Sequence, residues 1–141
     1  MAMESGMRRY ALMILLIAAL HGGFGVTLAA AAAHIETSPL LATASQLMMI
    51  HAAAGAALAA VLLALRTAGR AFAFLIYALQ AGVTLFCAGL ALSVFSQQRL
   101  FSYAAPMGGS ITILAWAALA VWTAVRLLRT RGADAEDMED I

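Results

Sequence analysis

Long runs of apolar residues alternate with short polar segments along the chain. A helix needs about 20 mostly apolar residues to cross roughly 30 Å of hydrocarbon at 1.5 Å per residue. Four runs meet this requirement. They cover about residues 10–33, 44–65, 71–95 and 108–128. The segments between them are so short that neighbouring helices must run in opposite directions. The pattern therefore predicts an all-α membrane protein, a compact bundle of four antiparallel transmembrane helices.

Composition excludes an ordinary water-soluble domain. Of the 141 residues, 65% are hydrophobic and 11% are charged, and the mean hydropathy is +0.95. Soluble domains have about 45–50% apolar and about 25% charged residues, so a soluble chain of this composition would expose an aggregation-prone surface. The net charge of +1 does not indicate a basic surface for binding nucleic acid. Because Cys87 is the single cysteine, an intrachain disulfide and a CxxC-type metal site are excluded as well.

The arginines predict the orientation in the membrane. Seven of the eight lie before the first run, in the middle connection at Arg66 and Arg70, or at the end of the last run and beyond it, whereas Arg99 lies in the third connection. The positive-inside rule then places both termini in the cytoplasm. Residues 8–31 could also be read as a signal peptide, but their apolar run is about twice the usual core of 7–15 residues.

The composition changes abruptly at the C-terminal end. Residues 132–141 contain several acidic residues and no basic one. The acidic residues are Asp134, Glu136, Asp137, Glu139 and Asp140. A block of like charges is typically solvated and mobile, although it can also dock to a basic partner surface. We therefore divide the chain into a four-helix transmembrane domain, residues 1–131, and an acidic cytoplasmic tail, residues 132–141.

Polar residues inside a membrane span are costly and need an explanation. Counting the helical rise from the ends of the runs places four of them in one layer near the middle of the membrane: His21, His51, Gln80 and Thr84. One interpretation is hydrogen bonding between helices. The other is a binding pocket for a lipid, a quinone head group or a haem held between two histidines. The spans contain no acidic residue, which argues against cation export driven by proton exchange at a buried carboxylate.

A second candidate site lies at the outer end of the predicted bundle. Pro106, Gly108 and Gly109 are typical of a turn followed by a helix start, because proline fixes φ and glycine permits close approach of the backbone. Alternatively, they form the lip of an outward-facing pocket lined by His34 and His51. Methionines near this end could join the histidines in binding Cu(I), but methionine is a common gap filler in apolar helices. No close-spaced set of ligands is present, so we predict no metal site.

Several short motifs follow one another in a distinctive order. They are Ala32-Ala33-His34 at the end of the first run, Met49-Ile50-His51-Ala52 in the second, Phe86-Cys87-Ala88-Gly89-Leu90 in the third, and Pro106-Met107-Gly108-Gly109 followed by Trp116 in the fourth. Together they resemble domain-of-unknown-function family 423, small bacterial inner-membrane proteins that are similar to mitochondrial transmembrane protein 256. The resemblance covers about residues 18–125, with departures at residues 29–33 and at Ala105. It implies a four-span protein of the bacterial inner membrane and no established activity.

The sequence favours a structural role over catalysis. No catalytic constellation is recognisable, and small residues that allow helices to approach closely in lipid are plentiful. We therefore expect a protein without enzymatic activity, an accessory or assembly subunit that packs against a larger membrane complex or forms a homo-oligomer. The alternative is a module that binds a lipid, quinone or haem in the His21, His51, Gln80 and Thr84 layer. A bound cofactor is not required by the first hypothesis.

Overall fold

The computed structural model of the chain consists of four long helices and describes residues 2–35, 37–65, 68–96 and 103–139. The helices are α1 (Ala2–His34), α2 (Pro39–Ala64), α3 (Gly69–Phe95) and α4 (Ala104–Glu139). No strand occurs in these ranges. Each helix contains a segment that is long and apolar enough to cross a membrane. The prediction of an all-α protein built from four apolar helices is confirmed.

The chain itself determines where two of these helices begin. Ser38 has an extended backbone (φ −130°, ψ 124°), and Pro39 follows as the first residue of α2, where the missing N–H is not needed. Gly69, the first residue of α3, has a φ of +72°, which residues with a side chain rarely adopt. Pro39 and Gly69 thus allow sharp connections between long helices.

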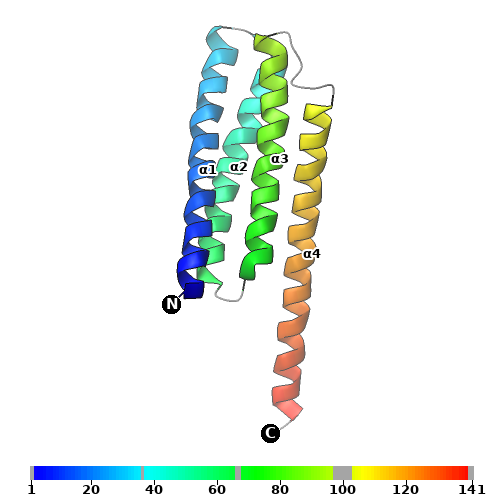
Figure 1. Cartoon of the computed structure of the whole chain (residues 1–141). Coiled ribbons are helices and arrows are strands. Elements are labelled where there is room, and N and C mark those ends of the chain that lie inside the picture. The colour runs from blue at the N-terminus through cyan, green and yellow to red at the C-terminus, as the bar shows by residue number, and fades with distance from the viewer. Residues whose placement is uncertain (1, 36, 66–67, 97–102, 140–141) are drawn as a thin grey trace.

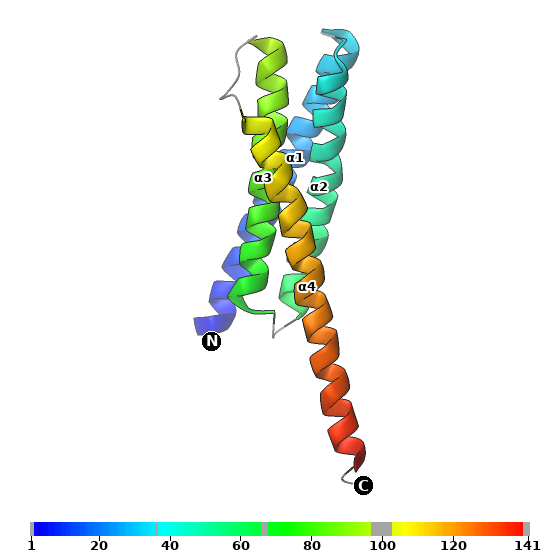
Figure 2. The same cartoon turned by 90° about the vertical axis from the view of Figure 1, so that its right-hand side faces the viewer.

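The four helices do not pack equivalently. Successive helices run in alternating directions along the bundle (Figure 1). α1, α2 and α3 all approach one another, whereas α4 packs along α3. Within the described ranges, the backbone of α4 does not come close to that of α1 or α2. Figure 2 shows α4 inclined across α3, so its C-terminal part swings toward the side of α2. The result is a three-helix unit with a fourth helix attached at one side.

Glycines bring α4 directly against α3. A methyl group added at Gly108 would collide with the backbone of Phe86, and one added at Gly82 would lie 2.7 Å from the Thr112 hydroxyl oxygen. Contacts this close require residues without a side chain, as is common where helices pack in membranes. Pro106 and Gly108 thus both lie inside the first turns of α4, and Gly108 lets α4 pack closely on α3.

The C-terminal end of α4 extends well beyond the other helices (Figures 1 and 2). Leu65, just after α2, lines the same cavity as Ala124 of α4. α4 continues from Ala124 to Glu139, which at 1.5 Å per residue is about 22 Å of additional helix. The residues that we expected to form a mobile tail therefore continue the helix. Apart from Gly132, most of them are at least moderate helix formers, and such residues extend an existing helix at little cost.

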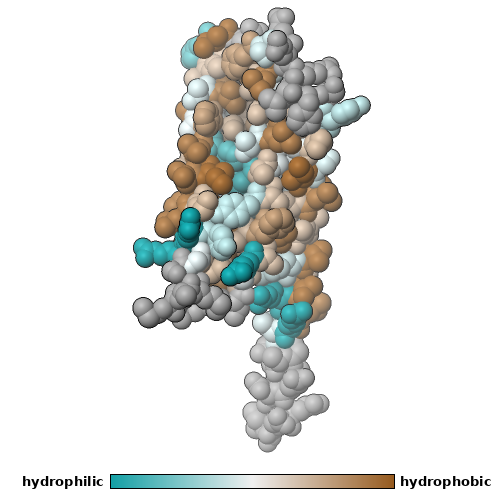
Figure 3. All heavy atoms as spheres, in the orientation of Figure 1, coloured by the Kyte–Doolittle hydropathy of each residue, from teal (hydrophilic) through white to brown (hydrophobic). Residues whose placement is uncertain are grey.

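The surface fits an apolar environment. On the face shown in Figure 3, hydrophobic side chains cover most of the height of the bundle, and strongly hydrophilic ones gather at the end where α1 begins and α4 leaves. Several large apolar side chains of α4, including Ile113 and Leu114, are about 70% and 67% exposed. Such exposure is stable in lipid but would not be stable in water.

Candidate functional site

A hydrogen bond between His51 and Trp116 joins α2 to α4. The His51 side chain is 6% exposed, and the Trp116 indole N–H donates to its Nε2 over 3.2 Å. Because an indole nitrogen can only donate, His51 Nε2 must be the unprotonated nitrogen of the ring. The other nitrogen, Nδ1, then carries the proton and donates it to the Leu47 carbonyl oxygen, 2.9 Å away. Both ring nitrogens of a neutral His51 are thus engaged.

A second set of hydrogen bonds joins α1 to α3. The Thr84 hydroxyl donates to the Gln80 carbonyl oxygen over 2.8 Å, so its oxygen is available as an acceptor. His21 Nε2 lies 2.8 Å from that oxygen and is therefore the protonated ring nitrogen. His21 is 3% exposed, whereas Thr84 lies at the surface of the bundle.

Gln80 joins α3 to α2 at the same level. Its side chain is 1% exposed, and its amide nitrogen donates to the His51 carbonyl oxygen over 3.2 Å. The amide passes so close to Gly55 that a methyl group there would collide with it. These contacts define a polar layer across all four helices. It consists of His21, His51, Gln80, Thr84 and Trp116.

The structure brings together the four residues predicted for the mid-membrane layer, and it adds Trp116. The depth of Trp116 in the fourth run could have suggested this, because an indole N–H inside a membrane span needs a hydrogen-bond acceptor. What sequence spacing did not indicate is the pairing. His21 bonds to Thr84, and His51 bonds to Trp116 and to its own helix rather than to His21.

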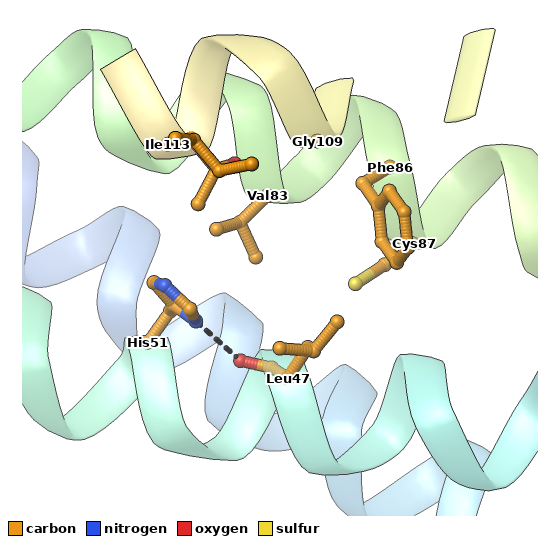
Figure 4. A pocket seen from close by; sticks show the side chains of 8 residues that line it. Leu47, His51, Val83, Phe86, Cys87, Gly109 and Ile113 are labelled. Carbon is orange, nitrogen blue, oxygen red and sulfur yellow. Dashed lines mark hydrogen bonds between the residues drawn. The ribbon is translucent and has the colours of Figure 1, made fainter. Parts of the chain in front are cut away.

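An apolar cavity of about 250 Å³ lies beside His51, between α2, α3 and α4 (Figure 4). Its lining residues are Leu47, His51, Val83, Phe86, Cys87, Gly109, Thr112 and Ile113. The polar groups among them already have partners within the chain. The Cys87 thiol lies 3.5 Å from the Ala44 carbonyl oxygen, and the Thr112 hydroxyl donates to the Gly108 carbonyl oxygen over 2.9 Å. The cavity therefore offers hydrophobic contact rather than free hydrogen-bonding groups.

A larger cavity of about 620 Å³ lies nearer the end of the bundle where α2 ends and α3 begins. Its walls include Leu58 of α2, Leu65 just after α2, Phe72 of α3, and Trp116 and Trp122 of α4. His51 lines the first cavity and Trp116 lines the second, so the hydrogen-bonded pair lies between them.

The predicted lip residues are not all gathered at one site. Gly109 lines the smaller cavity together with His51, Gly108 is buried against α3, and Pro106 is exposed. His34 is exposed at the end of α1 and lines neither cavity.

The arrangement fits a lipid chain better than a quinone head group or a haem. Ligation of haem iron by His51 would break its bond to Trp116 or to Leu47, and His21 lines neither of the two cavities. A quinone carbonyl needs a hydrogen-bond donor, and the donors around the smaller cavity already have acceptors. In the described part of the chain, no group of three or more His, Cys, Asp or Glu residues could hold a metal ion.

Four helices that are long and apolar enough to cross a membrane, joined by a polar layer with a buried centre, are typical of a small multi-pass membrane protein. A protein family described as "Protein of unknown function (DUF423)" matches residues 21–109, which is more than half of the chain. The chain belongs to this family, and the resemblance noted in the sequence is confirmed. The matched region includes every layer residue except Trp116. No curated protein and no solved structure matches the chain.

Proposed function

We propose that this protein is a non-catalytic accessory or assembly subunit of a larger complex in the bacterial inner membrane, with both termini in the cytoplasm. The observation that carries the proposal is the projection of α4 about 22 Å beyond the other helices. The part of α4 that projects from the bundle presents a surface to which a second protein can bind. The buried polar layer supports a structural role, because its hydrogen bonds join helix to helix.

The charges along the projecting helix favour a basic partner surface. Arg126, Arg129 and Arg131 occur where α4 leaves the bundle, and the guanidinium of Arg126 lies 4.9 Å from the centre of a Trp122 ring. The following residues, 134–140, are rich in acid. Acidic residues near the C-terminus of a helix oppose its dipole by roughly 0.3–1 kcal/mol each. Basic groups of a partner would relieve this repulsion, so docking would stabilise the end of the helix.

The proposal is tested by affinity purification of the tagged full-length protein in mild detergent, followed by mass spectrometry. The test variant replaces Asp134 and Asp137 by Asn and Glu136 and Glu139 by Gln, which removes four negative charges. The matched control exchanges Asp for Glu and Glu for Asp at the same positions and keeps the charge. We expect a stoichiometric partner with the natural protein and with the control, and its loss in the neutralised variant. Recovery of monomer or homodimer alone from the natural protein would refute the proposal.

A second candidate function is the binding of a lipid acyl chain, which the apolar cavity of about 250 Å³ favours. Gly109 forms part of its wall, so the change Gly109→Leu would fill the space. The matched control is Gly23→Leu on α1, where an added methyl group meets no atom within 4 Å. If the cavity holds a lipid, co-purified lipid falls in Gly109→Leu and not in the control. A visible absorbance scan of the same sample tests for haem through its Soret band.

A further inference from the structure

The larger cavity is an open groove on the side of the bundle where α2 and α4 face each other. The backbones of these two helices do not come close in the described ranges, so only side chains close the space between them. Val61, Leu65 and Trp116 line the groove and are 39%, 45% and 42% exposed. Because side chains of its wall are also exposed at the surface, the groove is open to the surroundings of the bundle.

The size and the chemistry of this α2–α4 groove fit one acyl chain of a lipid. Its volume of about 620 Å³ lies within the range of roughly 300–1,000 Å³ that is usual for ligand sites. From Trp116 to Ala124 it follows α4 for about 12 Å, which is most of the roughly 15 Å that one leaflet contributes to the hydrocarbon core. The described residues that line it carry no charge, and the Thr123 hydroxyl donates to the Leu119 carbonyl oxygen over 2.8 Å. The groove therefore offers contact to hydrocarbon.

A positively charged side chain lies at one end of the α2–α4 groove. The Arg126 guanidinium lies over the Trp122 ring, 4.9 Å from its centre, and the Trp122 ring packs against the Phe72 ring with 4.5 Å between their centroids. Trp122 and Phe72 both line the groove, so Arg126 is at its edge. Arg126 also lies where α4 leaves the bundle, the end at which strongly hydrophilic side chains gather (Figure 3). Tryptophan and arginine at the end of a membrane span are typical of the level of the lipid head groups.

We propose that the α2–α4 groove binds one anionic phospholipid, with an acyl chain between the two helices and the phosphate at the Arg126 guanidinium. A guanidinium presents five N–H donors in a planar fork and pairs with a phosphate through two parallel hydrogen bonds. In a choline lipid the phosphate charge is balanced within the same head group, so the net attraction favours an anionic lipid. Basic pockets between transmembrane helices are recurrent sites for anionic head groups. The groove is separate from the smaller cavity beside His51, so this site does not depend on the functions proposed above.

The two tryptophans of the chain both line the groove, so their fluorescence reports what occupies it. The full-length protein is reconstituted in bilayers that mix phosphatidylcholine and phosphatidylglycerol, with bromine on the acyl chains of one lipid at a time to quench nearby tryptophan. We expect phosphatidylglycerol to be favoured about five-fold, the factor that corresponds to about 1 kcal/mol for one arginine near anionic lipid. Equal quenching by the two lipids would overturn the proposal, because ordinary boundary lipid gives that result. Absence of quenching by either lipid would overturn it too, since a second copy or another protein would then cover the groove.

Two pairs of variants locate the site. Arg126→Gln removes the charge at the groove, whereas Arg8→Gln removes one at the exposed start of α1, a helix that does not line the groove. We expect the preference for phosphatidylglycerol to disappear in the first variant and to remain in the second. Ala120→Leu fills the groove, whereas Ala60→Leu adds the same bulk to an exposed residue of α2 outside it.

The leucine pair tests the acyl chain independently of the charge. At a low fraction of brominated phosphatidylglycerol, quenching should fall several-fold in Ala120→Leu and stay unchanged in Ala60→Leu. Equal quenching in these two variants would overturn the assignment of the acyl chain to the groove. An unchanged lipid preference in Arg126→Gln would overturn the assignment of the phosphate. Ala120 and Ala60 are both exposed, so the leucine pair still decides the question if Arg126→Gln does not fold.

Discussion

The change Gly55→Ala places one methyl group at the point where the polar layer is most tightly packed. The added Cβ would collide with the amide nitrogen of Gln80 and lie 3.1 Å from Cβ of Ala18. The Gln80 amide has to move, and its hydrogen bond to the His51 carbonyl oxygen is lost. The variant therefore tests sterics and hydrogen bonding at one position in α2.

The expected loss of stability follows from three contributions. The interhelical hydrogen bond is worth about 0.6 kcal/mol on average in a membrane bundle. Forcing a methyl group into a packed core costs about 1–3 kcal/mol. Replacing glycine by alanine inside a helix returns about 1 kcal/mol. The net destabilisation is about 0.6–2.6 kcal/mol.

The measurement is reversible unfolding in mixed micelles, monitored by the fluorescence of Trp116 and Trp122 and by circular dichroism. Gly23→Ala is the matched control, because nothing lies within 4 Å of the added methyl group and the residue is exposed. The control should be as stable as the natural protein or more stable by up to about 1 kcal/mol. Equal stability of Gly55→Ala and Gly23→Ala would show that Gln80 does not pack against α2 as described.

Further changes test other parts of the structure. His51→Gln should be nearly silent, because its amide oxygen can accept from Trp116, whereas His51→Leu should cost about 1 kcal/mol in the same unfolding assay. Gly108→Ala should destabilise the contact of α4 with α3 by about 1–3 kcal/mol, and an unchanged unfolding midpoint would contradict that packing. Reporter fusions after Arg131 and in the connection between α2 and α3 should read cytoplasmic, and a fusion between α1 and α2 should read periplasmic. Opposite signals at the first two sites would reverse the orientation.

Sequence alone predicted the number and type of the helices, because an apolar run of sufficient length has few alternatives in lipid. It predicted the ends of the helices less well. The apolar run that we placed at 108–128 lies inside the much longer α4, Ala104–Glu139. Hydropathy marks the part of a helix that fits the hydrocarbon core, whereas the backbone hydrogen bonds that define a helix continue into the polar region.

The sequence predicted how deep in the membrane the candidate site residues lie. It did not predict toward which neighbouring helix each side chain points. The rise per residue placed His21, His51, Gln80 and Thr84 at one level, and the structure joins them there. Which residues pair depends on how each helix is rotated and on which helices are neighbours. For the same reason the spacing could not show which helices share a cavity. Gly109 lines the smaller cavity together with His51, and His34 lines neither of the two cavities described.

The attachment of α4 to a three-helix unit has a consequence for biosynthesis. Helices enter the bilayer in the order of translation, and α1, α2 and α3 already approach one another in all three pairs. The chain can therefore assemble this unit while α4 is still inside the ribosome and the insertion machinery. His21, Gln80 and Thr84 have their bonds by then, whereas the unprotonated nitrogen of His51 must wait for Trp116. Arrival of the last helix thus completes the final hydrogen bond of the layer and marks the chain as fully inserted.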